Sequence, residues 1–275
     1  MTAQQPARRS RHRKPEKVHK VTATQILGEL LITISVLLFS FAFYEAYWTN
    51  VEAGKKQHVV SQQMEANWGH EYVNPRKKLT PQLGEAFARM YIPAFGSDFA
   101  FAIVEGTTDD DLLKGPGRYV DSQMPGKNGN FAVAGHRVGK GAPFNDLGNL
   151  KACDAVIVET QSSWDIYRIM PIDAQGETRR AEAANCFNPT QVEAMTTGRY
   201  AEVQGRHITL PSDYAVVNPV PGYETTEITP DMQALMTMTT CHPQFSNAER
   251  MIVHAMKVRS ETKTGSDRPI EFQEG

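Results

Sequence analysis

Three residues at the ends of β-rich segments could together carry out acyl transfer through a thioester. Cys241 follows the threonine-rich, apolar run 237–240, and a thiol at a strand end is held rigidly yet can be reached by a substrate. His136 ends the apolar run 131–135, and an imidazole can transfer protons near neutral pH. Arg250 opens the next β-rich run, where a guanidinium can stabilise a thiolate or an oxyanion.

The motifs around these residues resemble those of the sortases, the membrane-anchored cysteine transpeptidases of Gram-positive bacteria. In that family the nucleophile ends a Thr-Leu-x-Thr-Cys motif, which residues 237–241 match with Met238 in the Leu position. The family's catalytic histidine lies in a Gly-His-Arg string, as at residues 135–137, and its arginine lies in the strand after the cysteine, as Arg250 does. The resemblance implies that this cysteine, histidine and arginine are catalytic.

A longer string, Cys-His-Pro-Gln-Phe-Ser-Asn at 241–247, is similar to the class E, housekeeping-type sortases of actinobacteria. The resemblance covers roughly residues 88–259 and implies an eight-stranded β-barrel. It also implies cleavage of a C-terminal sorting signal between Thr and Gly, then transfer to an amine of a peptidoglycan precursor, lipid II. Class E members are expected to prefer Leu-Ala-x-Thr-Gly over Leu-Pro-x-Thr-Gly. The expected partners are therefore secreted proteins with such a signal; no cofactor is required, and the net charge of −2 gives no indication of nucleic acid.

Neighbouring residues suggest further roles at such a site. Thr240 precedes the nucleophile, and its backbone or hydroxyl could help to orient the substrate. Tyr91 is a weaker candidate for shaping the sorting-signal pocket, since a tyrosine in a strand is more often a packing residue. His242 should face away from whatever Cys241 faces, because adjacent residues of an extended chain point in opposite directions.

The chain contains three cysteines. If Cys241 is the free nucleophile, Cys153 and Cys186 could form a disulfide in an exported protein, or both could be small buried hydrophobic residues. Sortases often have Gly near the position of Cys153 and lack most of the segment that carries Cys186. Both cysteines would then depart from the family pattern together.

An N-terminal membrane anchor is predicted at residues 24–48. The segment is mostly apolar and long enough to cross a bilayer as a helix. Residues 8–20 are rich in Lys and Arg, which places the N-terminus in the cytoplasm and the rest of the chain outside. A cleaved signal peptide is the alternative, but the apolar core is long and no small-x-small site follows it. We therefore expect a single-pass protein of the cell membrane with an extracellular catalytic domain.

The remaining chain is divided by composition. We expect a basic cytoplasmic tail at 1–23, an extracytoplasmic spacer at 49–87 that is partly helical, a catalytic domain at 88–260 and a polar tail at 261–275. Short β-rich runs between Gly and Pro turns predict an all-β barrel or sandwich. Residues 172–213 are long for a sortase and are interpreted as an insertion beside the substrate groove. The expected strands are 88–92, 99–104, 131–135, 155–160, 164–169, 207–210, 214–218, 235–240 and 251–258, with short helices near 109–114, 143–150 and 190–195.

Other functions fit less well. A zinc site at Cys241, His242 and His254 lacks a fourth ligand and a Cys-x-x-Cys pair. A calcium site is not indicated either, because Asp109–Asp111 is better explained as a helix start. An L,D-transpeptidase would carry a Ser-His-Gly-Cys run, and a pilus-polymerising sortase usually has a second, C-terminal membrane helix. The alternative of a different class is a non-catalytic, membrane-tethered envelope protein.

Overall fold

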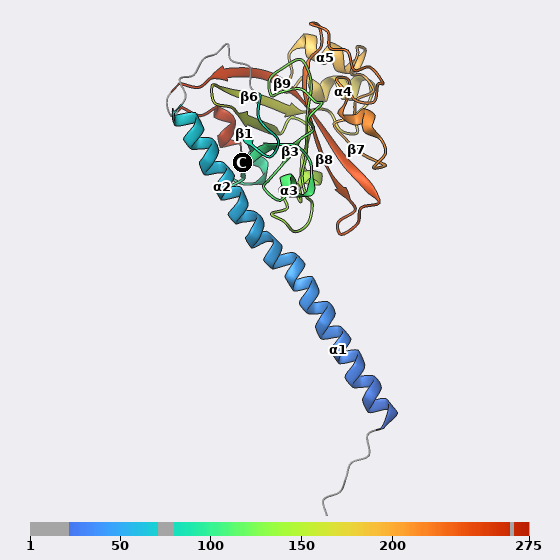
Figure 1. Cartoon of the computed structure of the whole chain (residues 1–275). Helices are drawn as coiled ribbons and strands as arrows, with labels where there is room; N and C mark the ends of the chain where they lie inside the picture. The colour runs from blue at the N-terminus through green and yellow to red at the C-terminus, as the bar shows by residue number, and fades with distance from the viewer. Residues whose placement is uncertain (1–21, 71–79, 265–266, 275) are drawn as a thin grey trace, which may run out of the picture. The chain divides into compact units, whose positions relative to one another are not determined.

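The computed structural model of the protein describes residues 22–70, 80–264 and 267–274, and its chain divides into two units at the boundary between Phe43 and Tyr44 (Figure 1). The first unit contains helix α1, Ala23–Phe43, in which no residue is buried. Among the described residues, α1 is the one helix long and apolar enough to cross a membrane. The predicted anchor at 24–48 also includes the π-helical turn η1, Tyr44–Trp48, and most of the predicted basic tail lies outside the described residues.

The second unit is built on a closed β-barrel, as predicted. Eight strands follow one another in the order β6-β5-β1-β2-β3-β4-β8-β9, and the pairing of β6 with β9 closes the barrel. A ninth strand, β7, pairs only with the first part of β9, ahead of the part that pairs with β6. The strands are β1 Ala86–Tyr91, β2 Ala100–Glu105, β3 Gly117–Arg118, β4 Gly129–Ala134, β5 Ala155–Glu159, β6 Ser163–Ile169, β7 Arg206–Thr209, β8 Ala234–His242 and β9 Glu249–Thr262.

Residues of β8 alternate between the inside and the outside of the barrel. Met236 and Met238 belong to the main hydrophobic core, together with Phe131 of β4 and Val253 of β9. Because successive residues of a strand point to opposite faces, Thr237, Thr239 and Cys241 face outward. The candidate nucleophile therefore lies on the outer surface of the barrel, at the end of a strand that is anchored from within by its alternate residues.

Two short helices pack on the outer face of β8 and β9, at the end far from Cys241. Helices α4, Gly176–Ala183, and α5, Pro189–Thr196, form a second core with Leu235 and Met256 (Figure 1). Leu235 is six residues before Cys241, so this core lies about 20 Å along β8 from the thiol at the rise of an extended strand. The helices of segment 172–213, which we interpret as an insertion, thus lie at the far end of the strand, and its strand β7 pairs beside Arg250.

Two local predictions differ from the structure. The run 214–218 was expected to be a strand, but Tyr214–Val217 is the 3-10 helix η4, because a short apolar run does not distinguish the two. Strand β3 was not predicted, since two residues carry no periodicity. The short helices expected near 109–114 and 190–195 are α3, Asp109–Leu112, and α5, and the segment 143–150 contains the 3-10 helix η3, Leu147–Asn149. The acidic run at α3 is a helix start, in which Thr108 and Asp111 form a capping box.

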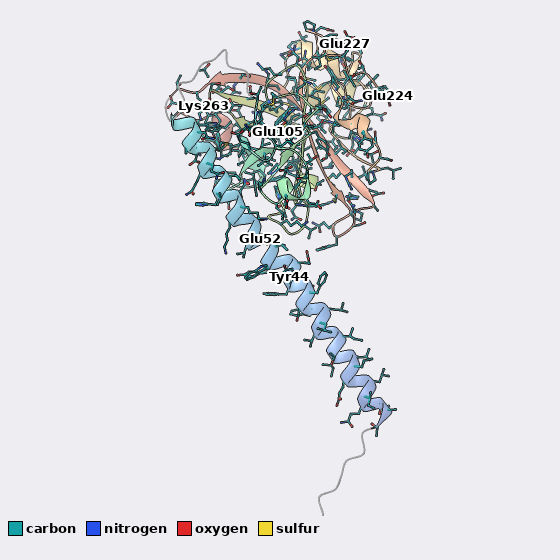
Figure 2. All side chains as sticks on the ribbon, in the orientation of Figure 1. Tyr44, Glu52, Glu105, Glu224, Glu227 and Lys263 are labelled. Carbon is teal, nitrogen blue, oxygen red and sulfur yellow. A yellow bond between two sulfur atoms is a disulfide. The ribbon has the colours of Figure 1, made fainter. Side chains whose placement is uncertain are left out.

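The segment predicted as a spacer contains a helix that packs on the barrel. Helix α2, Thr49–His70, buries Val60 and Met64 against the barrel. Their partners are Ala102 and Val104 of β2 and Ala86 of β1. Lys263 lies near the C-terminal end of this helix (Figure 2), with its ammonium nitrogen 4.6 Å from the centre of the Trp68 ring. The helical part of the predicted spacer is therefore part of the barrel unit.

The polar C-terminal segment also packs on the barrel. In the 3-10 helix η5, Ile270–Gln273, the Phe272 ring lies edge-on to Tyr91 and Trp164, with centroid distances of 4.9 and 5.6 Å. The neighbouring Glu271 is buried and pairs with Arg168 and Arg259. Burial alone would raise the pKa of Glu271, but hydrogen bonds from Arg259 lower it below its usual value.

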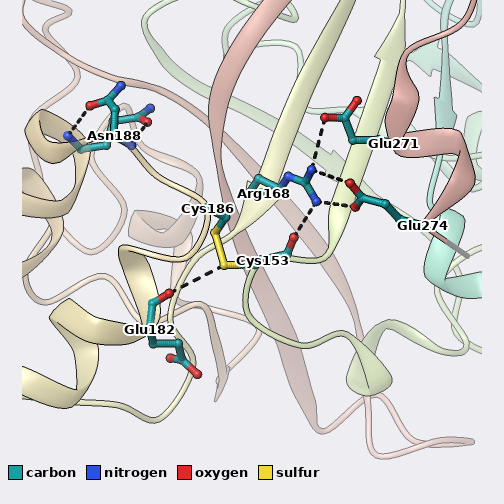
Figure 3. Close-up of a disulfide and its surroundings, with 8 residues drawn as sticks. Cys153, Arg168, Glu182, Cys186, Asn188, Glu271 and Glu274 are labelled. Carbon is teal, nitrogen blue, oxygen red and sulfur yellow. Dashed lines mark hydrogen bonds and ion pairs between the residues drawn. A yellow bond between two sulfur atoms is a disulfide. The ribbon is translucent and has the colours of Figure 1, made fainter.

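A disulfide joins Cys153 to Cys186, with their Cα atoms 5.8 Å apart (Figure 3). It connects the loop before β5 to the segment after α4. Cys153 has a φ of 72°, a conformation that favours glycine, and its carbonyl oxygen accepts a hydrogen bond from Arg168. A glycine at this position could therefore adopt the same backbone without strain.

Removing the disulfide should destabilise the fold by an amount that depends on the replacement at residue 153. The closed loop spans 33 residues, so Cys153→Ala with Cys186→Ala is expected to lower the free energy of unfolding by roughly 3–4 kcal/mol. Cys153→Gly with Cys186→Ala should recover about 1 kcal/mol, because Gly adopts a positive φ without strain. Urea denaturation in detergent would measure both; equal stability of the two variants would contradict the backbone argument.

Candidate active site

The three candidate catalytic residues lie in one row across neighbouring strands. Cys241 of β8 is directly opposite Arg250 of β9 in the antiparallel register. On the other side, β4 runs parallel to β8 with Ala134 opposite Thr239, so the same register, continued by two residues, brings His136 opposite Cys241. Residues in register on adjacent strands point to the same face of a sheet. The Cys, His and Arg side chains therefore arise from one outward-facing row.

Two hydrogen bonds maintain this alignment beyond the end of β4. The Gly135 amide donates to the Thr239 carbonyl at 3.0 Å, and the buried Thr240 hydroxyl donates to the Gly135 carbonyl at 2.8 Å. Gly135 also allows the Phe144 ring to pack closely, since a Cβ at this position would lie 2.5 Å from it. The structure thus places Thr240 inside, where its hydroxyl fastens the histidine-bearing segment to β8.

His136 is a half-buried imidazole whose environment favours the neutral form. Burial lowers its pKa from the usual 6.5, the charge of Lys140 lowers it further, and Asp109 opposes the shift. Its Nε2 atom is buried and has no hydrogen-bond partner among the described residues. A neutral imidazole with a free nitrogen can accept a proton from a nucleophile or a substrate.

Arg137 connects the histidine segment to the backbone of β8. Its guanidinium donates to the Cys241 carbonyl at 3.3 Å and lies 2.6 Å from Nδ1 of His242. Nε2 of His242 is 3.9 Å from the Glu249 carboxylate. Nδ1 of His242 is thus engaged by Arg137, whereas Nε2 of His136 has no partner among the described residues, which makes His136 the candidate proton carrier.

Cys241 is the one free cysteine of the chain, since the other two form the disulfide. It is half-buried, and its thiol donates to the side-chain oxygen of Asn247 at 3.4 Å. The thiol is therefore accessible at the strand end, as the sequence predicts for a nucleophile.

The sequence of the barrel matches a known family. The Sortase domain model matches residues 90–258. The chain belongs to the sortase family. The solved structure of the SrtF sortase from Corynebacterium diphtheriae is 63% identical, with a TM-score of 0.72, covering 74% of this chain and all of that one.

Two curated sortases extend the similarity to class E. Sortase SrtE1 of Streptomyces coelicolor is 28% identical over 94% of this chain, and Sortase SrtE2 of the same organism is 24% identical over 94% of it. The chain spans 63% of the length of SrtE1 and 90% of that of SrtE2. Sortases are cysteine transpeptidases, a chemistry that uses a thiol as its nucleophile.

Tyr119 lies beside the candidate row and was not predicted from the sequence. Its hydroxyl lies 2.8 Å from that of Thr239, one row before Cys241. Burial raises the pKa of the Tyr119 phenol; the Thr239 hydrogen bond and the charge of Arg250 oppose this, and Cys241 adds to it. The phenol therefore lies within the electrostatic range of both catalytic candidates and stays protonated at neutral pH. Tyr119 directly follows β3 and is 120 residues from Thr239 in the sequence, so no local pattern links the two residues.

Tyr91 lies in a different part of the sortase barrel. Its hydroxyl donates to Glu159 at 2.7 Å, and its ring packs against Trp164 and Phe272. Burial raises the pKa of Tyr91 to about 12. These partners do not belong to the Cys241 row, so the contacts give Tyr91 a packing role and do not support a substrate-binding one.

His254 supports the strand that carries the nucleophile. It is opposite Thr237 in the β8–β9 register, and its Nδ1 is 2.8 Å from the Thr237 hydroxyl, which in turn donates to Asn130. Burial lowers the pKa of His254 to about 3, so the ring is neutral. The imidazole therefore belongs to a buried polar network with Thr237 and Asn130. Thr237 precedes Cys241 by four residues on β8, so this network supports the strand that carries the nucleophile.

The pH profile of the reaction should report the environment of His136. If neutral His136 is needed, kcat/KM is constant at neutral pH and falls on the acid side, with a midpoint below the ordinary histidine pKa of 6.5. Lys140→Gln should move that midpoint upward, because it removes a charge that lowers the pKa. Peptide cleavage from about pH 5 to 9 would measure it, with the exposed Lys151→Gln as the matched control. An unshifted midpoint in Lys140→Gln would contradict this assignment.

Proposed function

We propose that this chain is a class E-type housekeeping sortase that cleaves a C-terminal sorting signal between Thr and Gly and joins the Thr carboxyl to an amine. The observation that carries the proposal is the row of His136, Cys241 and Arg250 at the ends of β4, β8 and β9, in a chain that belongs to the sortase family. The row supplies a base, a nucleophile and a cation on one face.

In the first half of the reaction, the Cys241 sulfur attacks the carbonyl carbon of the substrate threonine. The thiol proton passes to His136 as the carbon–sulfur bond forms, and the Arg250 guanidinium stabilises the negative charge on the carbonyl oxygen. The carbon–nitrogen bond to glycine then breaks, and His136 returns the proton to the leaving amine. The products are a thioacyl-enzyme and a peptide that begins with glycine.

In the second half, an amine attacks the thioester carbon. His136 removes a proton from the incoming nitrogen as the new carbon–nitrogen bond forms, and the carbon–sulfur bond breaks to release Cys241, which regains the proton. Water can resolve the thioester in the same way, only more slowly. The proposed acceptor is an amine of the peptidoglycan precursor lipid II, and the proposed donors are secreted proteins with a Leu-Ala-x-Thr-Gly or Leu-Pro-x-Thr-Gly signal.

This function requires the active site to be outside the cell. We propose that α1 crosses the membrane once, with the basic residues of segment 8–20 on the cytoplasmic side. The length and apolar character of α1 support this arrangement. Exported substrates and the lipid-linked acceptor would then meet the enzyme on the extracellular side of the cell membrane.

The proposal is tested by incubating the purified chain with both signal peptides and reading the protein by intact mass. We expect a thioacyl adduct, cleavage after threonine, and a new amide when an amine acceptor is added, with the Leu-Ala-x-Thr-Gly peptide preferred. If neither peptide reacts while Cys241 is still alkylated by iodoacetamide, the proposed sorting signal is wrong. If Cys241 is also inert, the transpeptidase proposal itself fails.

A further inference from the structure

The loop 137–143, which follows His136, is hydrogen-bonded to the first turn of helix α2. The Lys140 amide donates to the Thr49 hydroxyl at 3.2 Å, and the Gly141 amide donates to the Asn50 side-chain oxygen at 2.9 Å. Thr49 and Asn50 begin helix α2, between the labelled residues Tyr44 and Glu52 in Figure 2. The two side chains thus hold the tip of a loop whose first residue after the histidine is Arg137.

The Thr49 hydroxyl links the backbone of two segments. It donates to the Glu45 carbonyl in the π-helical turn η1 and accepts from Lys140. π-Helical turns within helices are frequent at functional sites. Gly139 permits the close approach, because a Cβ there would lie 3.1 Å from the Glu45 carbonyl oxygen and 3.2 Å from the Thr49 hydroxyl. The contact therefore depends on the side chain of Thr49 and on the lack of one at Gly139.

The backbone of this loop needs support from outside itself. Residues 139–142 all have positive φ, at 61°, 52°, 83° and 39°, and two of them, Lys140 and Ala142, are not glycine. A non-glycine residue in this region is strained and persists only where the surrounding structure holds it. The hydrogen bonds from Lys140 and Gly141 to helix α2 provide that restraint.

The base of the same loop carries the catalytic candidates. The Phe144 amide donates to the His136 carbonyl at 3.1 Å and closes the loop, while Arg137 donates to the carbonyl of Cys241. The charge of Lys140, at the tip, acts on the imidazole of His136. The tip is therefore connected to the histidine by the closed loop 137–143.

We propose that Thr49 and Asn50 are positioning residues for catalysis, which fix the loop 137–143 and thereby hold His136 beside Cys241. The catalytic part of this inference rests on the proposed transpeptidase function. On this proposal, the first turn of α2 helps to set the position of His136. This turn directly follows the predicted membrane anchor in the chain. Packing of α2 on the barrel through Val60 and Met64 is a separate matter, since those residues lie at least two turns further along the helix.

The test uses the full chain in detergent with substitutions of Thr49 and Asn50. Thr49→Val keeps the shape of the side chain but removes both hydrogen bonds, and Asn50→Ala removes the second acceptor. The double variant is expected to lower kcat for peptide cleavage about tenfold or more with little change in KM, because a displaced base slows the chemical step. Thr49→Ser keeps the hydroxyl and should remain within about twofold of the wild type. Asn67→Ala, at an exposed position of the same helix, is the matched control.

A second readout does not depend on turnover. The His136 imidazole can be titrated by NMR in chain labelled at histidine, with the signal assigned by its loss in His136→Gln. Release of the loop should relieve burial and move Lys140 away, so the titration midpoint of the double variant should rise toward the ordinary 6.5, and Thr49→Ser should restore the wild-type midpoint. Because Asn50 is exposed, Asn50→Ala alone leaves the packed face of α2 intact and serves if the double variant does not fold.

The two readouts separate this inference from the proposed function. If the wild type cleaves neither peptide, the proposed function fails, and the His136 midpoint still decides whether Thr49 and Asn50 control the loop. If the wild type is active but the double variant keeps both its kcat and its His136 midpoint, the positioning role is overturned. The positioning role would also be overturned if Thr49→Ser lowered kcat as much as the double variant does.

Discussion

Cys241→Ala is expected to abolish the thioacyl adduct and to lower kcat/KM for peptide cleavage by about 10⁴-fold or more. The substitution removes the atom that forms the covalent intermediate, while His136 and Arg250 alone offer no nucleophile. The fold should be unaffected, because Cys241 lies half-buried at the outer end of β8 and the core side chains of that strand are Met236 and Met238. Circular dichroism and a urea titration would establish that the variant is folded.

The measurement is unambiguous because the chain has only three cysteines and two of them are paired. Iodoacetamide should therefore add one carbamidomethyl group to the wild type and none to Cys241→Ala, as read by intact mass without reduction. The variant with both Cys153 and Cys186 replaced by alanine is the control, and it should still form the adduct. An adduct with substrate in Cys241→Ala would show that another residue is the nucleophile.

Arg250→Lys is expected to preserve the fold and to lower kcat/KM by about 10²–10³-fold, the usual loss when one oxyanion donor is removed. Arg250 is directly opposite Cys241. Its guanidinium also donates to the Glu249 carbonyl at 2.9 Å, and this hydrogen bond orients the guanidinium. A lysine keeps the charge but offers a single, strongly hydrated ammonium in place of a planar group with several donors. The effect should therefore fall mainly on kcat.

The control for Arg250→Lys is the same change at Arg199, which forms an exposed pair with Asp231. Surface pairs of this kind contribute little, so Arg199→Lys should keep kcat/KM within about twofold of the wild type. Single-turnover mass spectrometry would separate slow acylation from slow release. Near-wild-type acylation in Arg250→Lys would remove Arg250 from the chemical step, even if the overall rate fell.

The residues of the candidate site could be selected from the sequence because each of them lies in a short local pattern. The Thr-rich run before Cys241, the histidine after residues 131–135 and the arginine of the next strand each lie in a short segment whose pattern identifies it as a strand end. The barrel prediction also holds, because alternation along strands such as β8 is enforced by burial of every second residue. Local patterns could not reveal that Tyr214–Val217 is a 3-10 helix, or where the segment 172–213 packs on the barrel.

The chain's own sequence determined the chemical groups, the apolar span and the alternation of the strands, since each depends on residues within a few positions of one another. Only the tertiary structure decided which groups meet. It placed Tyr119 beside Thr239, moved Tyr91 into a separate packing cluster, joined Cys153 to Cys186, and set Thr49 and Asn50 on the loop of His136. These contacts join residues at least 33 positions apart, and some depend on loop backbones with positive φ. Their energy comes from burial and hydrogen bonds that exist only once the barrel has closed, and no segment of the sequence carries them alone.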